Sequence, residues 1–435
     1  MKNLKLKFLS YFLLLAAYPV FGQNFQPLAQ IPVPLSGSAE VYAFSDENGI
    51  TLLFKEGTEA QLYLLDLNFK VKQNYTLYDL PAEGRLQRVG FTNLPDQLNI
   101  YYWSEDSDEY QVYAISKSEG TAKTMNFDVG RVRKGLIYWG TFTFDGVLHI
   151  LRMPRNTNTI RICRFEGEDN FDTREFSIDK ADFLEKTDYE LTRIEQPEEL
   201  SLTDVYLPGK MYHYGESVFL TLDEPGFTYL VSINLRTGQK LEQNITGPGF
   251  AQLSSWKSNS AFLGNYLYQL AASEDSLKLQ IMDVRGGQIV RSYAFGAEDD
   301  LAIQTGGITL MDELGNEKSI FRTADFLQEV ARTDYLAILA QNSPEAPMTE
   351  LCMGGVKPTQ VRGVSGVVLD ESYRSVFFRS VLSQPAFLPV SAPLASSNRR
   401  PTFPGGEAHF VRGAYRGQIF RGYYDPRAKA FKIGR

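Results

Sequence analysis

Short apolar runs alternate with polar residues along most of this chain, and they come in pairs joined by a polar turn. The second run of each pair recurs as LYLLDL, VYAISK, IRICRF, LVSINL and LQIMDV, at Leu62–Leu67, Val112–Lys117, Ile160–Phe165, Leu230–Leu235 and Leu279–Val284. The fifth positions of these runs, aligned on their turns, are Asp66, Ser116, Arg164, Asn234 and Asp283, which lie 50, 48, 70 and 49 residues apart. Alternation with a period of two predicts β-strands. The chain is therefore predicted to repeat a small β unit.

Each unit has three readable strands. An apolar strand such as Ile50–Phe54 or Leu98–Trp103 comes first, and we predict that it is the innermost one. A polar hairpin leads to the recurring strand, and a second turn leads to an amphipathic outer strand such as Ala122–Phe127. A strand-built period near 50 residues is typical of radial β arrays. We predict an all-β fold, a β-propeller of about seven blades, with six or eight as alternatives.

The rhythm is interrupted twice and loosens toward the end. Asp179–Thr203 is charged and lacks strand alternation, so we expect an insertion that forms a loop or short helix on one face, either as part of a binding face or as a solvated excursion. Ser383–Gly406 is rich in Pro, Ser and Gly and is expected to be a long loop. Gly307–Glu313 and Lys318–Asp325 are predicted to form a sixth strand pair.

The two ends of the repeat are expected to meet. Ala428–Gly434 has a strand pattern and is predicted to pair with an N-terminal strand such as Ala39–Phe44. Such pairing would hide two sheet edges that an open array exposes. We therefore treat residues 23–435 as a single propeller domain.

The first 22 residues have the pattern of a secretory signal peptide. Lys2, Lys5 and Lys7 precede a short apolar segment, and Val20-Phe21-Gly22 is a small-x-small cleavage site, so the mature chain is expected to begin at Gln23. The apolar segment is short for a membrane span, so we expect a secreted or periplasmic protein without stable membrane insertion.

Charge is distributed unevenly along the chain. The formal net charge is -8, and residues 351–435 hold 13 Lys and Arg against 4 Asp and Glu. The acidic remainder argues against binding to nucleic acid, which needs a clustered positive surface. The basic end is expected either to pack on the acidic body or to dock on an anionic partner.

The sequence indicates neither a metal site nor a cofactor. Two cysteines and three histidines cannot form a standard zinc motif, and the acidic loop Glu105–Glu109 lacks the glycine and distal glutamate of an EF-hand. Cys163 lies in a predicted strand, and Cys352 precedes Met353-Gly354-Gly355, which we expect in a loop. Whether the two cysteines pair is left open.

No catalytic motif is present, so catalytic residues are not assigned and the protein is interpreted as more compatible with binding than with catalysis. Nucleophile-elbow, Walker and zincin patterns are absent from the sequence. If aromatic residues line a ligand-binding mouth, the candidates are Tyr212, His213 and Tyr214 next to the insertion, together with Trp139 and Trp256. The alternative is that these aromatic side chains belong to the core.

The chain resembles the β-propeller proteins with six to eight blades that bacteria of the Bacteroidota type export. The resemblance rests on the segment Val-Phe-Gly-Gln at residues 20–23 and on the blade rhythm of residues 40–330. It implies architecture and export, and it assigns no functional residue. Three functions stay open, namely non-catalytic binding of a protein or glycan partner, cleavage of carbohydrate as a hydrolase or lyase that uses loop carboxylates, and a structural role in an envelope assembly. The oligomeric state is not predicted.

Overall fold

The computed structural model describes residues 27–33, 35, 39–46, 49–66, 68–80, 87–104, 109–127, 136–145, 147–154, 157–167, 170–180, 182–183, 191–194, 200–248, 256–343, 347–362, 368–390, 410–415, 418–425 and 428–434. The predicted signal peptide and its cleavage site lie outside these residues, as do most of the acidic loop after Trp103 and the predicted loop beyond Val390.

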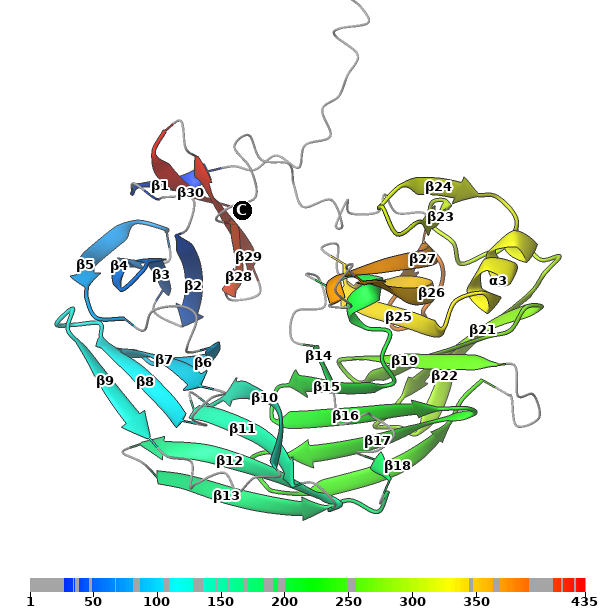
Figure 1. Cartoon of the computed structure of the whole chain (residues 1–435), viewed down its shortest axis with the longest axis horizontal. Helices are drawn as coiled ribbons and strands as arrows, with labels where there is room; N and C mark the ends of the chain where they lie inside the picture. The colour runs from blue at the N-terminus through cyan, green and yellow to red at the C-terminus, as the bar shows by residue number, and fades with distance from the viewer. Residues whose placement is uncertain are drawn as a thin grey trace, which may run out of the picture.

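The described strands form seven sheets placed around a common middle (Figure 1). The first three sheets, in chain order, contain β2 (Glu40–Asp46), β3 (Gly49–Glu56), β4 (Glu59–Leu65) and β5 (Val71–Leu77), then β6 (Gln87–Asn93), β7 (Gln97–Ser104), β8 (Glu109–Ser116) and β9 (Ala122–Phe127), then β10 (Leu136–Phe144), β11 (Val147–Pro154), β12 (Thr159–Gly167) and β13 (Asn170–Ser177). The next two contain β14 (Thr192–Ile194), β15 (Gly209–Tyr214), β16 (Ser217–Glu224), β17 (Phe227–Asn234) and β18 (Lys240–Thr246), then β19 (Lys257–Leu263), β20 (Tyr266–Ala272), β21 (Ser276–Asp283) and β22 (Gln288–Gly296).

The sixth sheet is built in a different chain order. Its strands are β23 (Ile308–Met311), β24 (Glu317–Ile320), β25 (Tyr335–Asn342), β26 (Met348–Arg362) and β27 (Val368–Ser383), arranged as β24-β23-β27-β26-β25. The predicted sixth pair is therefore present, as the outer hairpin β23–β24. The predicted second strand of that pair, Lys318–Asp325, stops at Ile320, and helix α3 (Thr323–Ala331) follows and leads inward to β25.

The two ends of the chain share the seventh sheet. Its strands are β28 (Phe410–Tyr415), β29 (Gln418–Asp425), β30 (Ala430–Gly434) and β1 (Pro27–Pro32), and β1 pairs with β30 in antiparallel register. The expectation that the last strand pairs near the N-terminus is confirmed. The expected partner, Ala39–Phe44, is wrong, because that segment belongs to β2 and pairs with β3.

This arrangement is a β-propeller, as predicted, with four or five strands in each blade. The prediction of the innermost strands is wrong. Ile50–Phe54 lies in β3 and Leu98–Trp103 in β7, which are the second strands of their sheets. Of the strands further inward, β2 had been recognised as a strand but assigned another partner, and β6, β10, β15 and β19 had not been recognised. Figure 1 shows these strands on the side of their sheets that faces the middle of the ring, where β14 lies further inward than β15.

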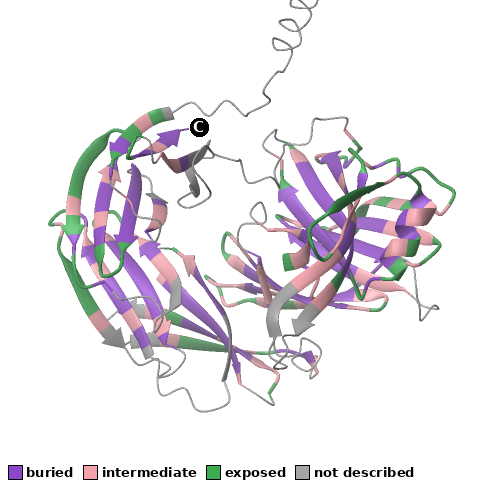
Figure 2. Ribbon diagram, turned by 45° about the horizontal axis from the view of Figure 1, so that its top comes forward, coloured by how far each residue is buried: buried purple, intermediate pink, exposed green. Residues whose placement is uncertain are grey.

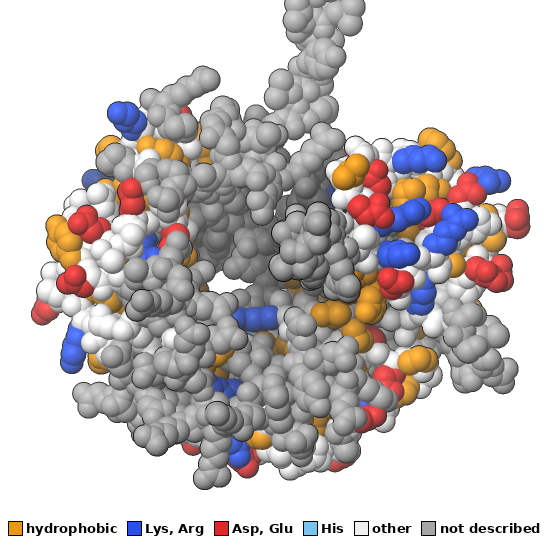
Figure 3. Space-filling model, viewed as in Figure 1, with side chains coloured by type: hydrophobic (Ala, Val, Ile, Leu, Met, Phe, Trp, Pro, Cys, Tyr) orange, Lys and Arg blue, Asp and Glu red, His pale blue; other side chains and the backbone are white. Residues whose placement is uncertain are grey.

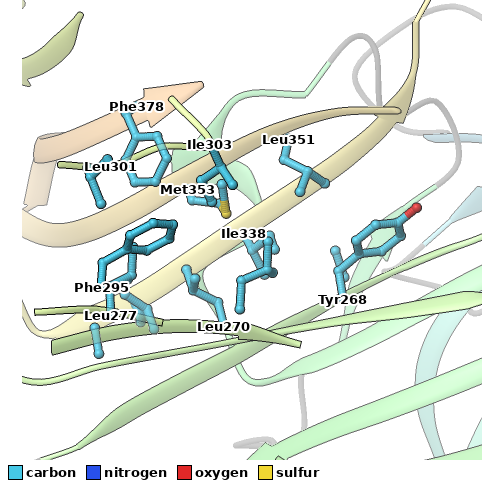
Figure 4. Packing of buried hydrophobic residues seen from close by; sticks show 14 of the residues in the cluster. Tyr268, Leu270, Leu277, Phe295, Leu301, Ile303, Ile338, Leu351, Met353 and Phe378 are labelled. Carbon is cyan, nitrogen blue, oxygen red and sulfur yellow. The ribbon is translucent and has the colours of Figure 1, made fainter. Parts of the chain in front are cut away.

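Apolar side chains fill the spaces between neighbouring sheets, while the outer strands carry most of the exposed positions (Figure 2). Figure 4 shows one such junction, between the β19–β22 sheet and the β25–β27 sheet. Its members include Tyr268, Leu270, Leu277, Phe295, Ile338, Leu351, Met353 and Phe378. Burial of this kind stabilises each blade only through its neighbours. In the described part of the chain no helix combines the length and the apolar character that crossing a membrane requires.

Both cysteines are free, buried thiols on separate blades. Cys163 lies in β12, as predicted, and Cys352 lies in β26, so the expected loop at Met353-Gly354-Gly355 is wrong. Close packing of β26 on β27 explains the glycine at position 354, because a Cβ on Gly354 would lie 1.9 Å from the carbonyl oxygen of Val376 on β27. Burial raises the pKa of the Cys352 thiol to about 11.

Candidate functional site

One face of the ring carries the hairpins that join the second and third strands of the blades, and we call it the hairpin face. Strand β15 begins at this face, where Gly209 pairs with Leu222 beside the turn between β16 and β17. At the corresponding end of β25, Tyr335 pairs with Val356, and β26 and β27 continue beyond that level from Lys357 to Arg362. The extended part of this hairpin is called the arm.

The predicted insertion starts on the hairpin face and is anchored there. The ammonium group of Lys180 forms an ion pair with Glu224, at the end of β16. The same group lies 5.5 Å from the ring centre of Phe227 and 5.8 Å from that of Tyr229, within the range of cation–π attraction. Phe183 is buried against Tyr229. The beginning of the insertion therefore packs on the fourth blade.

The insertion then enters the middle of the ring. Thr192–Ile194 forms β14, which pairs in parallel with β15 on its inner side. The short helix η2 (Leu202–Asp204) follows, and Leu202 and Val205 are buried with side chains of β25 and β26. The described part of the insertion therefore ends in a short helix, one of the two forms that we had expected, but it also contains strand β14 and packs into the protein.

Three tyrosines from distant parts of the sequence meet where the insertion reaches the arm. The ring of Tyr206 lies 4.9 Å from the ring of Tyr335 on β25 and 6.1 Å from the ring of Tyr373 on β27, measured between ring centres. Tyr335 is 38% exposed, although it sits at the first position of an innermost strand. We call Tyr206, Tyr335 and Tyr373 the tyrosine cluster.

The base of the arm is held in place by charged groups. Arg374 on β27 donates to a carboxylate oxygen of Glu329 on α3 at 2.5 Å, and Arg332 binds the other oxygen of the same carboxylate. Lys257 on β19 donates to the carbonyl oxygens of Val330, Ala331 and Thr333 at the end of α3. These contacts fix α3, the arm and the fifth blade relative to one another, so the tyrosine cluster stands on a rigid support.

The cluster was not found from the sequence because its members are far apart along the chain. Tyr206 follows the predicted insertion by three residues, and Tyr335 and Tyr373 lie in strands of the sixth blade, where the repeat had become irregular. Only the path of the insertion brings them together. Figure 3 shows hydrophobic side chains, among which tyrosine is coloured, gathered beside the middle of the ring and next to the β25–β27 sheet.

The predicted site residues Tyr212, His213 and Tyr214 lie on β15, where their side chains pack against neighbouring blades. Tyr212 is 2% exposed and packs against Phe262 of β19. The hydroxyl of Tyr214 donates to the backbone carbonyl of Phe262 at 3.0 Å. These contacts are those of core residues, and they leave Tyr212 without surface for a ligand.

His213 takes part in a stack of rings between the third and fourth blades. The ring of Phe142 lies 5.3 Å from that of His149 on one side and 4.7 Å from that of His213 on the other. Burial lowers the pKa of His149 to about 4, and the positive charges of Arg164 and Arg174 act in the same direction. Burial also lowers the pKa of His213. Both imidazoles are therefore neutral at physiological pH.

Trp256 is not part of this arrangement. Trp139 is on β10, and its side chain lies outside the described residues. Trp256 precedes β19 at the hairpin face, and the ammonium group of Lys278 lies 5.7 Å from its ring centre. Phe262 on β19 lies six residues after Trp256, which at about 3.3 Å per residue separates the two by roughly 20 Å. Because Tyr214 contacts Phe262, Tyr214 is far from Trp256. The structure therefore does not bring Trp256 to one site with Tyr212, His213 and Tyr214.

A crevice opens on the hairpin face between the fourth and fifth blades. Its empty volume is about 220 Å³, counting the part open to solvent. The lining residues are Gly226, Phe227, Thr228, Gly247, Pro248, Ser258, Asn259, Gln269, Leu270 and Ala271. The lining is uncharged, with amide and hydroxyl groups as its polar side chains. Within the described residues no cluster of three or more His, Cys, Asp or Glu side chains could hold a metal ion.

Comparisons with known proteins do not assign this chain to a family. No family model matches the sequence, and a search of curated proteins finds no match. Among solved structures, similarity extends to a member of the DUF4221 family from Bacteroides vulgatus, at 10% identity and a TM-score of 0.30, covering 94% of this chain and 97% of that one.

Two further similar structures have different roles. The WD40 domain of SCAP from fission yeast is 10% identical with a TM-score of 0.26, covering 75% of this chain and 72% of that one. A mutant apocarotenoid oxygenase from Synechocystis is 10% identical with a TM-score of 0.32, covering 60% of this chain. The present chain spans 63% of the length of that oxygenase. At these low scores the neighbours assign no function, and the propeller assignment rests on the sheets themselves.

Proposed function

We propose that this protein is an exported, non-catalytic β-propeller that binds a protein or glycan partner on its hairpin face, through the tyrosine cluster. The observation that carries the proposal is the convergence of Tyr206, Tyr335 and Tyr373 from three separate segments onto one rigid support. Tyrosine is enriched at binding surfaces because it offers a large apolar ring and a polar hydroxyl at low entropic cost.

The surroundings of the cluster favour binding over hydrolysis. Several carboxylates near this face are already engaged by cations, since Glu224 pairs with Lys180, Asp223 with Lys210 and Glu329 with Arg332 and Arg374. A glycosidase needs two carboxylates that remain available on either side of the scissile bond. The hydrolase alternative therefore receives no support from these residues.

The alternative of a structural role in an envelope assembly, with docking through the basic C-terminal stretch, also receives less support. Lys432 on the closing strand binds Asp425 of the neighbouring strand at 2.6 Å. That part of the stretch serves the seventh blade. Export to the periplasm or the medium is part of the proposal and rests on the signal-peptide pattern of residues 1–22.

Replacing Tyr335 with alanine is expected to weaken partner binding by at least 1 kcal/mol, about fivefold or more, as for a tyrosine near the centre of an interface. The change should leave the folded structure intact, because Tyr335 is partly exposed and its backbone pairing to Val356 is retained. The purified protein would be immobilised and probed with cell-envelope proteins and, separately, with a glycan library, and the affinity of each bound species would be measured.

Tyr78→Ala is the matched control, because Tyr78 is 59% exposed and follows β5 on the outside of the first blade. A species that binds both variants equally would not use the tyrosine cluster. If every ligand found in either screen behaves in that way, the proposal is overturned. Binding from the protein screen or from the glycan library decides which class of partner the site takes.

A further inference from the structure

Lys210 is an unusual residue for the interior of a propeller. It lies on β15, its side chain is 1% exposed, and it faces the junction between the fourth and fifth blades. Burial lowers the pKa of its ammonium group, and the nearby Asp223 carboxylate partly offsets that effect. Full burial of a lysine is rare, because desolvation of its charge costs several kcal/mol.

Two other side chains complete a buried triad with Lys210. Its Nζ atom lies 2.9 Å from Oδ1 of Asn259 on β19 and 3.3 Å from Oδ2 of Asp223 on β16. Asn259 is 2% exposed and Asp223 is 8% exposed. Only two acceptors contact Nζ, whereas an ammonium group has three donors to satisfy. A neutral amine would leave fewer donors unpaired in this site.

Asp223 and Asn259 are held in fixed positions. Oδ2 of Asp223 accepts a hydrogen bond from the backbone of Ser260 at 2.7 Å, and Oδ1 accepts one from Thr228 at 2.8 Å. The amide nitrogen of Asn259 donates to the carbonyl oxygen of Tyr206 at 3.0 Å. An amine, a carboxamide and a carboxyl group are thus oriented toward one another in a buried site, which is how reacting groups gain a large effective concentration.

We propose that Lys210 and Asn259 join through an intramolecular isopeptide bond, with the Asp223 carboxyl group as the proton relay. The amide oxygen of Asn259 is one C=O bond, about 1.2 Å, from Cγ, so Nζ lies within about 4 Å of the carbon that it attacks. That separation is close to the distance of about 3–3.5 Å that a near-attack geometry requires between the reacting atoms.

The reaction needs no cofactor or co-reactant. Asp223 first accepts a proton from the Lys210 ammonium group, which becomes a neutral amine. The Nζ lone pair forms a bond to Cγ of Asn259, and the bond from Cγ to Nδ2 breaks. Asp223 passes two protons from Nζ to Nδ2, which leaves as an ammonium ion, and Asp223 ends as a carboxylate. The products are one new amide and one ammonium ion, so the atoms and the charge of the starting Lys210 ammonium group balance. Asn259 also lines the crevice on the hairpin face, which gives the ammonium ion a route to solvent.

The test is the mass of the purified wild-type chain, measured after denaturation. The bond lowers the mass by about 17 Da, the mass of one ammonia. A tryptic digest should also contain a linked peptide that carries both Lys210 and Asn259, with no cleavage after Lys210. A cyclised N-terminal Gln23 would lower the mass by the same amount, so the linked peptide is the decisive signal. Wild-type protein alone therefore decides the proposal, whether or not any variant folds.

Variants show which residues are responsible. Lys210→Met and Asn259→Ala should restore the full mass, and Asp223→Asn should block or greatly slow the bond while retaining both partners. Lys257→Met is the matched control, because Lys257 is on the same strand as Asn259 but binds the end of α3. It should keep the linked peptide. Folded wild-type protein of full mass with free Lys210 and Asn259 peptides overturns the proposal, and the tyrosine cluster would be unaffected by that result.

Discussion

Removing the closing strand, residues 430–435, is expected to leave a chain that no longer unfolds in a cooperative transition. The deletion exposes the pairing edges of β1 and β29 and opens the seventh sheet, because β30 lies between them. It also removes Phe431 and Ile433, both fully buried in the cluster that joins the seventh blade to the first. Far-ultraviolet circular dichroism during urea unfolding would show a broad, early loss of structure.

A single substitution gives a graded form of the same test. Phe431 is 0% exposed and its ring lies 5.2 Å from that of Phe54 on β3, so Phe431→Ala should lower the free energy of unfolding by about 3–5 kcal/mol. Phe321→Ala is the control, because Phe321 is 91% exposed and should change stability by no more than about 0.5 kcal/mol. Equal effects of the two substitutions on the free energy of unfolding would contradict the claim that β30 joins the seventh blade to the first.

Stability is expected to fall as the pH is lowered from about 6.5 to about 4, through the ring stack between the third and fourth blades. The pKa of His149 is lowered from 6.5 to about 4 in the folded protein. Between these two pH values His149 is therefore protonated in the unfolded chain and neutral in the folded protein. The stabilisation is complete above the unfolded pKa and is lost as the pH falls through the folded pKa. Over the whole window it amounts to about 3 kcal/mol.

The charged and titratable groups that face His149 all lower its pKa. Arg164 on β12, Arg174 on β13 and His213 on β15 each disfavour a positive charge on its ring, and only a hydrogen bond with the backbone of Val147 opposes them. His149→Gln removes the titrating group and should flatten the dependence on pH relative to wild type. Urea unfolding at several pH values measures this difference. If the two proteins lose stability in parallel between pH 6.5 and 4, His149 is not the cause.

The sequence pattern predicted those strands whose buried positions are apolar. β8 and β21 contain the recurring runs, and apolar residues on both faces of these strands, such as Val112, Ile115 and Leu279, are fully buried. Most of the strands near the middle of the ring escaped detection, and in β19 the reason is that polar residues occupy buried positions. In β19, Asn259 and Ser260 are both buried and bind partners on the fourth blade, so the alternation that marks a half-buried strand is lost.

The candidate site could not be predicted for a different physical reason. Tyr206, Tyr335 and Tyr373 meet only because β14 adds to the inner side of β15 and η2 packs on β25 and β26. Such pairings join segments that are distant in sequence and leave no local pattern. The aromatic residues nearest the insertion, Tyr212 and Tyr214, drew attention instead, and their packing against Phe262 shows why an aromatic run in a β protein belongs more often to the core.

The measurement that tests the binding surface most directly is hydrogen exchange of the protein with and without the partner captured by the wild-type chain. Slower exchange is predicted around residues 200–206, at the start of β25 near Tyr335 and at the base of the arm near Tyr373, while β5 on the outside of the first blade exchanges as in the free protein. Protection confined to the outer strands, with no change around the tyrosine cluster, would contradict the account.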